Sequence, residues 1–186
     1  LEPVWLGTAG DDEKAIAPLL LKGLQGCDAV LCTGGVSAGD YDVTPAAMEK
    51  AGAAILCRGV DIKPGMACAY GCAGGKLILA LSGNPASAMT NFYAVVLPAL
   101  KKLAGRRETV APLFPVKLAS PFAKKSGKTR FLRGRLDLSA GYARLVVGGG
   151  QGNAVLSSAI GCDMMAVVPA GSGPLEAGTV LNGFLL

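Results

Sequence analysis

The chain has 186 residues, of which 51% are hydrophobic and 17% charged, so it is neither disordered nor highly charged. It contains no histidine, which excludes imidazole as a base, nucleophile or metal ligand. The net charge of +5 is unevenly distributed: residues 1–104 carry 8 basic and 9 acidic side chains, whereas residues 105–186 carry 10 and 4. This shift near Gly105 predicts two domains, 1–104 and 105–186.

The cysteine pattern and the lengths of the apolar runs indicate the cellular compartment of the protein. Six cysteines are scattered without a CxxC pair, which favours reduced thiols in a cytoplasmic protein over a disulfide or metal framework. Gly, Pro or Asn interrupts the apolar runs before they reach the roughly 20 residues that span a bilayer. We therefore expect a soluble protein with no membrane partner.

Strand and helix signals alternate along residues 1–104. Short apolar runs that end at turn residues predict three strands, at Val4–Leu6, Ala29–Thr33 and Ala54–Cys57. Acidic residues 11–13 suit the first turn of a helix that runs to about Gln25. Thr44 is expected to cap a second helix, with Pro45 in its first position and an end near Gly52.

A predicted hairpin and a long helix complete the first domain. Two apolar stretches, 67–72 and 76–81, surround Gly74-Gly75 and form the hairpin. A helix from Pro85 to about Ala104 follows, because its apolar side chains recur at three- and four-residue spacing. The alternation predicts an α/β fold, an open and mostly parallel sheet with flanking helices, whose ligands bind at the carboxyl ends of the strands.

The apolar runs of residues 105–186 are spaced differently from those of the first domain. Short apolar runs recur at intervals of roughly 10–17 residues and are separated by Gly, Ser and Pro turns. They lie at Val116–Leu118, Arg130–Leu138, Ala143–Val147, Met164–Val168 and Thr179–Leu181. The pattern predicts a small all-β domain, either a barrel or a sandwich.

The turn after the strand at 29–33 is a candidate anion site. Its sequence is TGGVSAGDYD (33–42), in which Gly34 and Gly35 allow backbone N–H groups to point into one concavity. Thr33 and Ser37 add hydroxyl donors. An ordinary strand-to-helix turn is the alternative interpretation.

A second turn, LSGNPAS (81–87), also follows a predicted strand. Gly83 permits a close approach of the backbone, Asn84 is suited to cap the next helix, and Pro85 takes its first position. Taken alone this turn indicates a helix cap, but two such turns on one sheet favour a shared anion site.

Acidic residues accompany the first turn and the first helix. Asp40 and Asp42, two residues apart, suit a shared Mg²⁺ ion or the orientation of a water molecule, with solvated loop carboxylates as the alternative. Asp11 and Asp12 follow the first predicted strand and either approach the same edge or serve as charge at a helix N-terminus.

The second domain contains a run of basic residues with no acid among them, namely Lys124, Lys125, Lys128, Arg130, Arg133 and Arg135. Such a cluster attracts phosphates, with a solvated basic hairpin as the alternative. Aromatic residues make up only 5% of the chain and no nucleic-acid signature is present, so we expect no nucleic-acid partner. The later segment with Ser157-Ser158 is either a functional polar loop or a plain connection.

The order of these motifs resembles the molybdopterin molybdenumtransferase family, to which the C-terminal domain of gephyrin is related. The matching segments are TGGVSAGDYD (33–42), IKPG (62–65), LSGNPASA (81–88), LKKLAG (100–105), GKTRFLRG (127–134), GGQGNAVLSS (149–158) and GTVL (178–181). The resemblance implies that residues 1–104 are a molybdopterin-binding α/β domain and residues 105–186 the family's C-terminal β domain.

The resemblance also implies a function, the insertion of molybdate into adenylylated molybdopterin with release of AMP, in molybdenum cofactor biosynthesis and with Mg²⁺ as cofactor. It assigns functional roles to Asp42 and Asp12, which we expect to be catalytic, and its Mg²⁺ dependence agrees with the metal site expected at Asp42 and Asp40. The implied substrate-binding residues are Thr33, Gly34, Gly35, Ser37, Gly83, Asn84, Pro85, Ser87, Arg130, Arg133, Ser157 and Ser158.

The chain departs from the family pattern in two ways. Ser82 stands where the family usually has proline. The family's first strand with a TGDE-like loop, and the N-terminal domains that help to form its homodimer, have no counterpart before Val4, so we expect a fragment of a longer homodimeric enzyme. The alternatives are adenylylation of molybdopterin, against which the second domain counts, and a non-catalytic scaffold that binds peptides.

Overall fold

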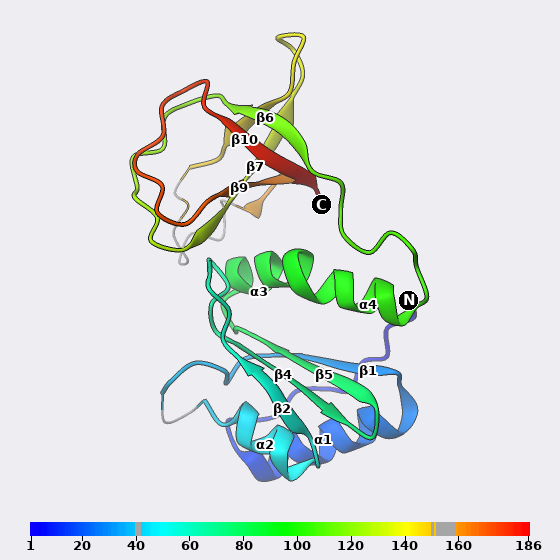
Figure 1. The fold of residues 1–186 in the computed structure, drawn as a ribbon. Helices are drawn as coiled ribbons and strands as arrows, with labels where there is room; N and C mark the ends of the chain where they lie inside the picture. Colours follow the sequence, from blue (N-terminus) through cyan, green and yellow to red (C-terminus); the bar gives the residue numbers. More distant parts are fainter. Residues whose placement is uncertain (40–41, 150, 152–158) are drawn as a thin grey trace. The chain divides into compact units, whose positions relative to one another are not determined.

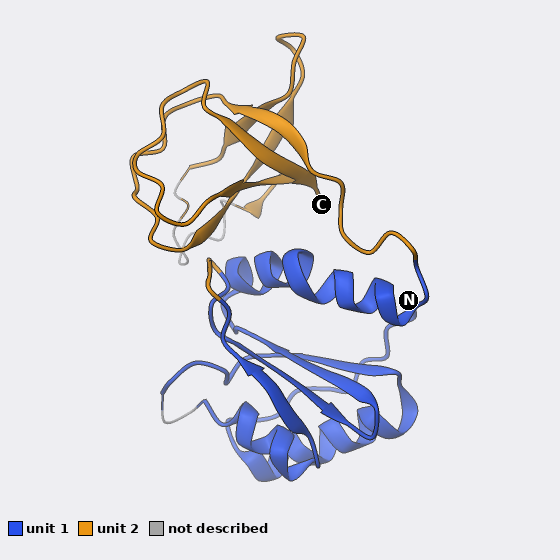
Figure 2. Cartoon of the chain, viewed as in Figure 1, with its two compact units in different colours: residues 1–60, 65–106 blue, residues 61–64, 107–186 orange. Residues whose placement is uncertain are grey.

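A computed structural model shows the fold of the chain (Figure 1) and describes residues 1–39, 42–149, 151 and 159–186. The chain divides into two compact units (Figure 2), which we call the α/β unit and the β unit. The α/β unit comprises Leu1–Val60 and Gly65–Arg106, and the β unit comprises Asp61–Pro64 and Arg107–Leu186.

The α/β unit is built on a four-stranded sheet in the order β1-β5-β4-β2. These strands are β1 (Ala29–Thr33), β5 (Lys76–Leu81), β4 (Cys68–Ala73) and β2 (Ala54–Arg58). Among the described pairs, β1 and β5 are parallel, whereas β5–β4 and β4–β2 are antiparallel. The expectation of a mostly parallel sheet was therefore wrong. Gly74-Gly75, with φ of 56° and 79°, forms a two-residue hairpin turn, and such a turn joins only antiparallel strands.

Helices flank both faces of this sheet, as the alternation predicts (Figure 1). α1 (Glu13–Gly26) and α2 (Thr44–Lys50) cover one face, and the helix that begins with α3 (Pro85–Asn91) covers the other. In the part of the chain that the structure describes, no helix is both long and apolar enough to cross a membrane.

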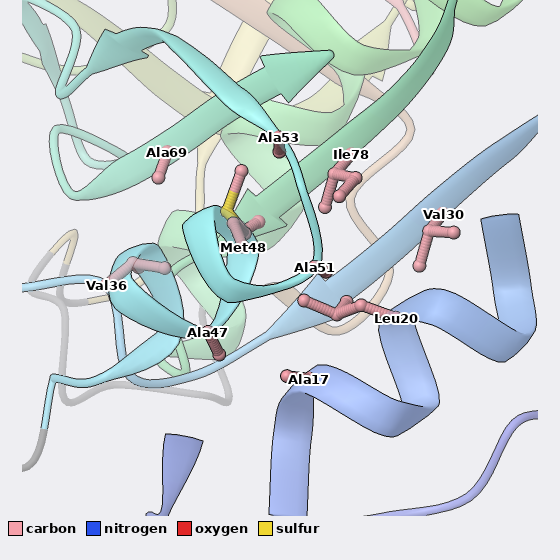
Figure 3. Packing of buried hydrophobic residues seen from close by; sticks show 11 residues of the cluster. Ala17, Leu20, Val30, Val36, Ala47, Met48, Ala51, Ala53, Ala69 and Ile78 are labelled. Atoms are coloured by element: carbon pink, nitrogen blue, oxygen red, sulfur yellow. The ribbon is translucent and has the colours of Figure 1, made fainter. Parts of the chain in front are cut away.

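Each face of the sheet has its own hydrophobic core. The core beneath α1 and α2 (Figure 3) consists of Ala17, Leu20, Val30, Val36, Ala47, Met48, Ala51, Ala53, Ala69, Ile78 and Ala80. On the other face, Leu79 and Leu81 pack against Val96. Successive residues of a strand point to opposite faces, so β5 contributes to both cores and is held from both sides.

The first predicted strand, Val4–Leu6, is absent, which corrects that expectation. Leu6 instead packs against the core beneath α1, and Trp5 is 81% exposed. These three apolar residues end at Gly7 and pair with no strand of the described sheet, so periodicity alone misassigned them.

The long helix predicted from Pro85 contains a π-helical segment. α3 continues into η1 (Phe92–Val96) and then α4 (Leu97–Leu103). Pro98 accounts for the change, because proline has no N–H and its ring crowds the carbonyl four residues earlier. The wider turn, in which the Leu97 N–H donates to the Phe92 carbonyl, accommodates the ring without ending the helix.

The β unit is a small barrel. Its sheet has the order β3-β7-β8-β6-β10-β9, and β7 also pairs with β9, so the strands from β7 to β9 close into a ring. The strands are β3 (Ile62–Lys63), β6 (Phe114–Leu118), β7 (Thr129–Asp137), β8 (Arg144–Val147), β9 (Met164–Val168) and β10 (Val180–Leu185). Closure leaves few free strand edges and confirms the predicted all-β domain.

One edge of β7 has a gap that a side chain fills. β3 pairs with Thr129 and Arg130, and β8 pairs from Gly134 onward. Between them, Gln151 Oε1 accepts the Arg133 N–H at 3.0 Å, and Gln151 Nε2 donates to the Arg133 carbonyl at 3.0 Å. The buried amide thus reproduces the two hydrogen bonds that a neighbouring strand would make.

Replacing this amide should weaken the barrel. We expect Gln151→Leu to lower the free energy of unfolding of the β unit by about 1–3 kcal/mol, because it leaves a buried N–H and carbonyl of β7 without partners. Urea unfolding, followed by NMR of the buried Met164 methyl group, measures the change. Gln25→Leu, an exposed position on α1, is the control, and equal stability of the two variants would refute the role assigned to Gln151.

Candidate functional site

The two glycine turns lie side by side at one edge of the sheet. β1 and β5 are parallel neighbours with Thr33 opposite Leu81, so both turns leave the carboxyl ends of adjacent strands. The Gly34 N–H donates to the Leu81 carbonyl at 2.9 Å, and a Cβ added at Gly83 would lie 3.4 Å from the Gly34 Cα. The two turns thus lie at one edge of the sheet, as expected, and their sharing of an anion stays a prediction.

The first turn is held in shape by the start of α2. Gly34 and Gly35 have φ of 101° and 64°, a backbone conformation that favours glycine. Thr44 Oγ1 donates to the Gly34 carbonyl at 2.9 Å, and the Thr44 N–H donates to the Gly35 carbonyl at 2.9 Å. Thr44 is therefore not the helix cap that the sequence predicts. α2 begins at Thr44 and Val43 takes the N-cap position, because the Thr44 hydroxyl is used across the turn.

Thr44 engages the carbonyls of this turn and leaves its amides available. Among the described residues, no hydrogen bond uses the N–H groups of Gly35, Val36 or Ser37. Thr33 precedes this turn and Ser37 ends it. Both residues are exposed and carry hydroxyl groups. Backbone N–H groups grouped in a glycine turn are the donors with which proteins bind phosphate-type anions.

The second turn is fixed by its own residues. Asn84 is the N-cap of α3, as predicted, and its Oδ1 accepts the Ser87 N–H at 3.1 Å. Ser87 is buried and Pro85 is exposed. Asn84 and Ser87 therefore shape the turn, while Gly83 lies against Gly34 of the first turn.

Asp42 closes the loop that follows the first turn. Its Oδ2 accepts the Gly39 N–H at 2.7 Å, and its own N–H donates to the Gly39 carbonyl at 3.0 Å. The carboxylate is half-buried and keeps one oxygen outside this pairing. Mg²⁺ in phosphate chemistry typically takes one or two protein carboxylates together with substrate oxygens, and the Asp42 carboxylate fits that donor set.

The other acidic candidates are less informative. Asp12 is the N-cap of α1, where its Oδ1 accepts the Lys14 N–H at 2.9 Å, and its catalytic role stays a prediction. Asp40 lies outside the described residues. Within the described ranges, no cluster of three or more His, Cys, Asp or Glu side chains is suited to hold a metal on its own.

The two candidate arginines of β7 are buried inside the β unit. Arg130 is 5% exposed and Arg133 is 0% exposed, and burial lowers the pKa of both guanidinium groups. The Arg130 guanidinium lies 5.4 Å from the centre of the Phe122 ring, and its Nε has no hydrogen-bond partner among the described residues. The alternative of a solvated basic hairpin does not apply to these two side chains, although Lys124 and Lys125 are exposed.

Sequence reasoning missed two residues that shape these regions. Thr44 anchors the first turn, and its place directly before a proline made it look like a cap. Gln151 anchors β7 from within the GGQGN segment, where an amide side chain between glycines was the available signal. Ser157 and Ser158, from the same segment, lie outside the described residues.

Family models match both parts of the chain. Residues 1–102 match a model described as a probable molybdopterin binding domain, and residues 115–185 match the MoeA C-terminal region, domain IV.

Known proteins resemble the chain over nearly all of its length. A molybdopterin molybdenumtransferase of Staphylococcus aureus strain Mu50 is 30% identical to this chain, and the match covers 94% of this chain and 42% of the relative. One of Staphylococcus epidermidis strain RP62A is 33% identical, and the match covers 93% of this chain and 41% of the relative. The crystal structure of a molybdopterin biosynthesis MoeA protein from Pyrococcus horikosii gives a TM-score of 0.79 at 26% identity, over 99% of this chain and 44% of that one. The chain thus spans less than half the length of these relatives.

Proposed function

The chain belongs to the molybdopterin molybdenumtransferase family, and we propose that it supplies part of an enzyme that inserts molybdate into adenylylated molybdopterin and releases AMP. The observation that carries the proposal is the contact between the two glycine turns at Gly34 and Gly83. Both turns end parallel neighbouring strands, the position at which α/β sheets bind their ligands.

The chemistry of the turns supports a polyanionic substrate. Adenylylated molybdopterin carries two linked phosphates, and the N–H groups of Gly35, Val36 and Ser37 provide neutral donors for such oxygens. Neutral donors bind phosphate without the desolvation that a buried ion pair requires. In this proposal Thr33 and Gly83 complete the cradle, while Asn84, Pro85 and Ser87 keep the second turn in shape.

Asp42 is the proposed catalytic carboxylate. A negative charge beside bound phosphates repels them unless a cation lies between, and Asp42, with Asp40 two residues before it in the sequence, would hold Mg²⁺ there. When bound, Mg²⁺ would offset the charge that develops on the phosphate oxygens as the bond to AMP breaks. Asp42 itself orients water toward the adenylyl phosphate through the oxygen that Gly39 does not engage.

The buried arginines support anion binding by the β unit. Arg130 is only 5% exposed, and its Nε has no hydrogen-bond partner among the described residues; this arrangement is costly for a guanidinium, and an anion would offset that cost. We propose that the Arg130 guanidinium binds this anion. Arg133, on the same strand, would hold β7 in place beside it. Ser157 and Ser158 remain proposed binding residues on the strength of the family resemblance.

The barrel favours molybdate insertion over adenylylation of molybdopterin. Residues 115–185 match the C-terminal region of MoeA, and an enzyme for adenylylation needs only the α/β domain. We further propose a boundary between residues 104 and 105, a cytoplasmic location, and a homodimer in the longer protein, with no nucleic acid and no membrane as partners.

A binding experiment tests the proposal. AMP, the proposed product, is titrated into the 186-residue chain while backbone amides are followed by NMR. We expect saturable shifts centred on Gly34, Gly35 and Gly83, and a loss of affinity of about tenfold or more in Gly35→Ala. A Cβ at Gly35 would lie 2.5 Å from Thr44 Oγ1, so the substitution must displace the turn.

Gly52→Ala provides the matched control. Gly52 also has a positive φ, 84°, but lies at the other end of α2, where a Cβ would meet nothing within 4 Å. The backbone strain of an alanine is therefore comparable at the two positions, but Gly52 follows the end of α2 that is opposite to the first turn. AMP shifts that are absent from the turns of the unmodified chain, or that survive Gly35→Ala unchanged, contradict the proposal.

A further inference from the structure

Ser82, where the family usually has proline, lies at the meeting point of the two turns. It directly follows Leu81, whose carbonyl accepts the Gly34 N–H at 2.9 Å. It directly precedes Gly83, at which an added Cβ would lie 3.4 Å from the Gly34 Cα. The residues on both sides of Ser82 thus lie close to the first turn, and Ser82 itself is half-buried at the same edge of the sheet.

The Ser82 hydroxyl is held by one hydrogen bond and retains a donor. Its Oγ accepts the Asn84 N–H at 3.2 Å. A hydroxyl that accepts one bond still has its own proton to donate, and among the described residues no hydrogen bond uses that proton. The Asn84 N–H also polarises the hydroxyl, which strengthens its donation to an anion.

We propose that Ser82 is a substrate-binding residue, whose hydroxyl donates to the phosphate group held between the two glycine turns. The inference rests on the proposed function, because it needs an anion at this edge of the sheet. A proline at this position offers no such donor, so the substitution from proline to serine adds one hydrogen bond to the site.

A proline would nevertheless fit here, which makes the proposal testable. The family usually has proline at this position, and outside the pairing of β4 with β5 no hydrogen bond among the described residues uses the Ser82 N–H. Ser82→Pro therefore keeps the turn and removes the hydroxyl, whereas Ser82→Ala removes the hydroxyl and frees the turn. Ser82→Thr keeps a hydroxyl that can both accept the Asn84 N–H and donate to the anion.

The experiment measures the affinity of the 186-residue chain for AMP in these three variants by the same NMR titration. We expect Ser82→Ala and Ser82→Pro to weaken AMP binding by about tenfold, the usual scale for losing one hydrogen bond to a charged oxygen. Ser82→Thr should remain within about twofold of the unmodified chain. The amide positions of Leu81 and Gly34 in the free spectra show whether the sheet edge is intact in each variant.

Two results would overturn the inference without affecting the proposed function. In the first, Ser82→Pro binds AMP as the unmodified chain does while Ser82→Ala binds weakly, which reduces Ser82 to a residue that shapes the turn. In the second, all three variants bind AMP equally. If the unmodified chain itself shows no AMP shifts at Gly34 and Gly83, the proposed function fails and the inference fails with it.

Discussion

Gly134→Ala is expected to destabilise the β unit by about 3 kcal/mol. A Cβ at this position would lie 2.5 Å from the Val146 carbonyl oxygen and 2.5 Å from Leu145 Cδ1. A side chain can rotate away, but the carbonyl belongs to the paired strand β8, where Gly134 lies opposite Val147. Relief of the clash therefore requires that β7 and β8 separate at this point of the barrel.

Unfolding of the barrel can be followed independently of the α/β unit. The methyl groups of Met164 and Met165 are fully buried in the β unit and report its unfolding by NMR in urea or on heating. For a domain of this size the expected change corresponds to a melting temperature about 10 °C or more lower. Gly127→Ala is the matched control, because Gly127 lies in the same unit and a Cβ there would meet nothing within 4 Å. If the two variants unfold together, Gly134 is not required for strand pairing.

Local sequence signals predicted the elements of the α/β unit more accurately than their pairing. The apolar run Ala29–Thr33 and the signature Asn84-Pro85 each predicted a boundary that the structure reproduces, because burial of a short run and capping of a helix depend on neighbouring residues. The direction of pairing depends on the connections between strands. Alternation of strands and helices predicts a mostly parallel sheet, although Gly74-Gly75 itself predicts a hairpin turn, which joins antiparallel strands.

The same distinction applies to the candidate site. The convergence of Gly34 and Gly83 was predictable, because adjacent parallel strands place their following turns at the same edge. Two hydrogen bonds were not predictable, because nothing in the local sequence indicates the partner. Thr44 bonds to the first turn across 10 residues, and Gln151 bonds to β7 across 18 residues. Burial of Arg130 was also hidden, since charged residues are expected at the surface.

Asp42→Asn is expected to have the largest effect on activity. An amide at this position still accepts the Gly39 N–H through its oxygen, so the loop keeps its closure. The substitution removes the negative charge that would hold Mg²⁺ and orient water. In the proposed full-length enzyme, we expect the release of AMP from adenylylated molybdopterin in the presence of molybdate to fall by about 100-fold or more. Binding of the pterin substrate should be largely preserved, because the glycine turns are unchanged.

Two further carboxylates make this result specific. Asp28 is exposed at the amino end of β1, whereas the turns leave its carboxyl end, so Asp28→Asn should release AMP at the unmodified rate. Asp12→Asn keeps an N-cap for α1, since asparagine caps helices as well as aspartate does, and any loss of AMP release there reflects chemistry instead of helix stability. Mg²⁺ titration adds a second readout, in which Asp42→Asn should require a higher Mg²⁺ concentration for whatever activity remains. Full AMP release by Asp42→Asn would place the catalytic carboxylate elsewhere, with Asp12 as the first candidate.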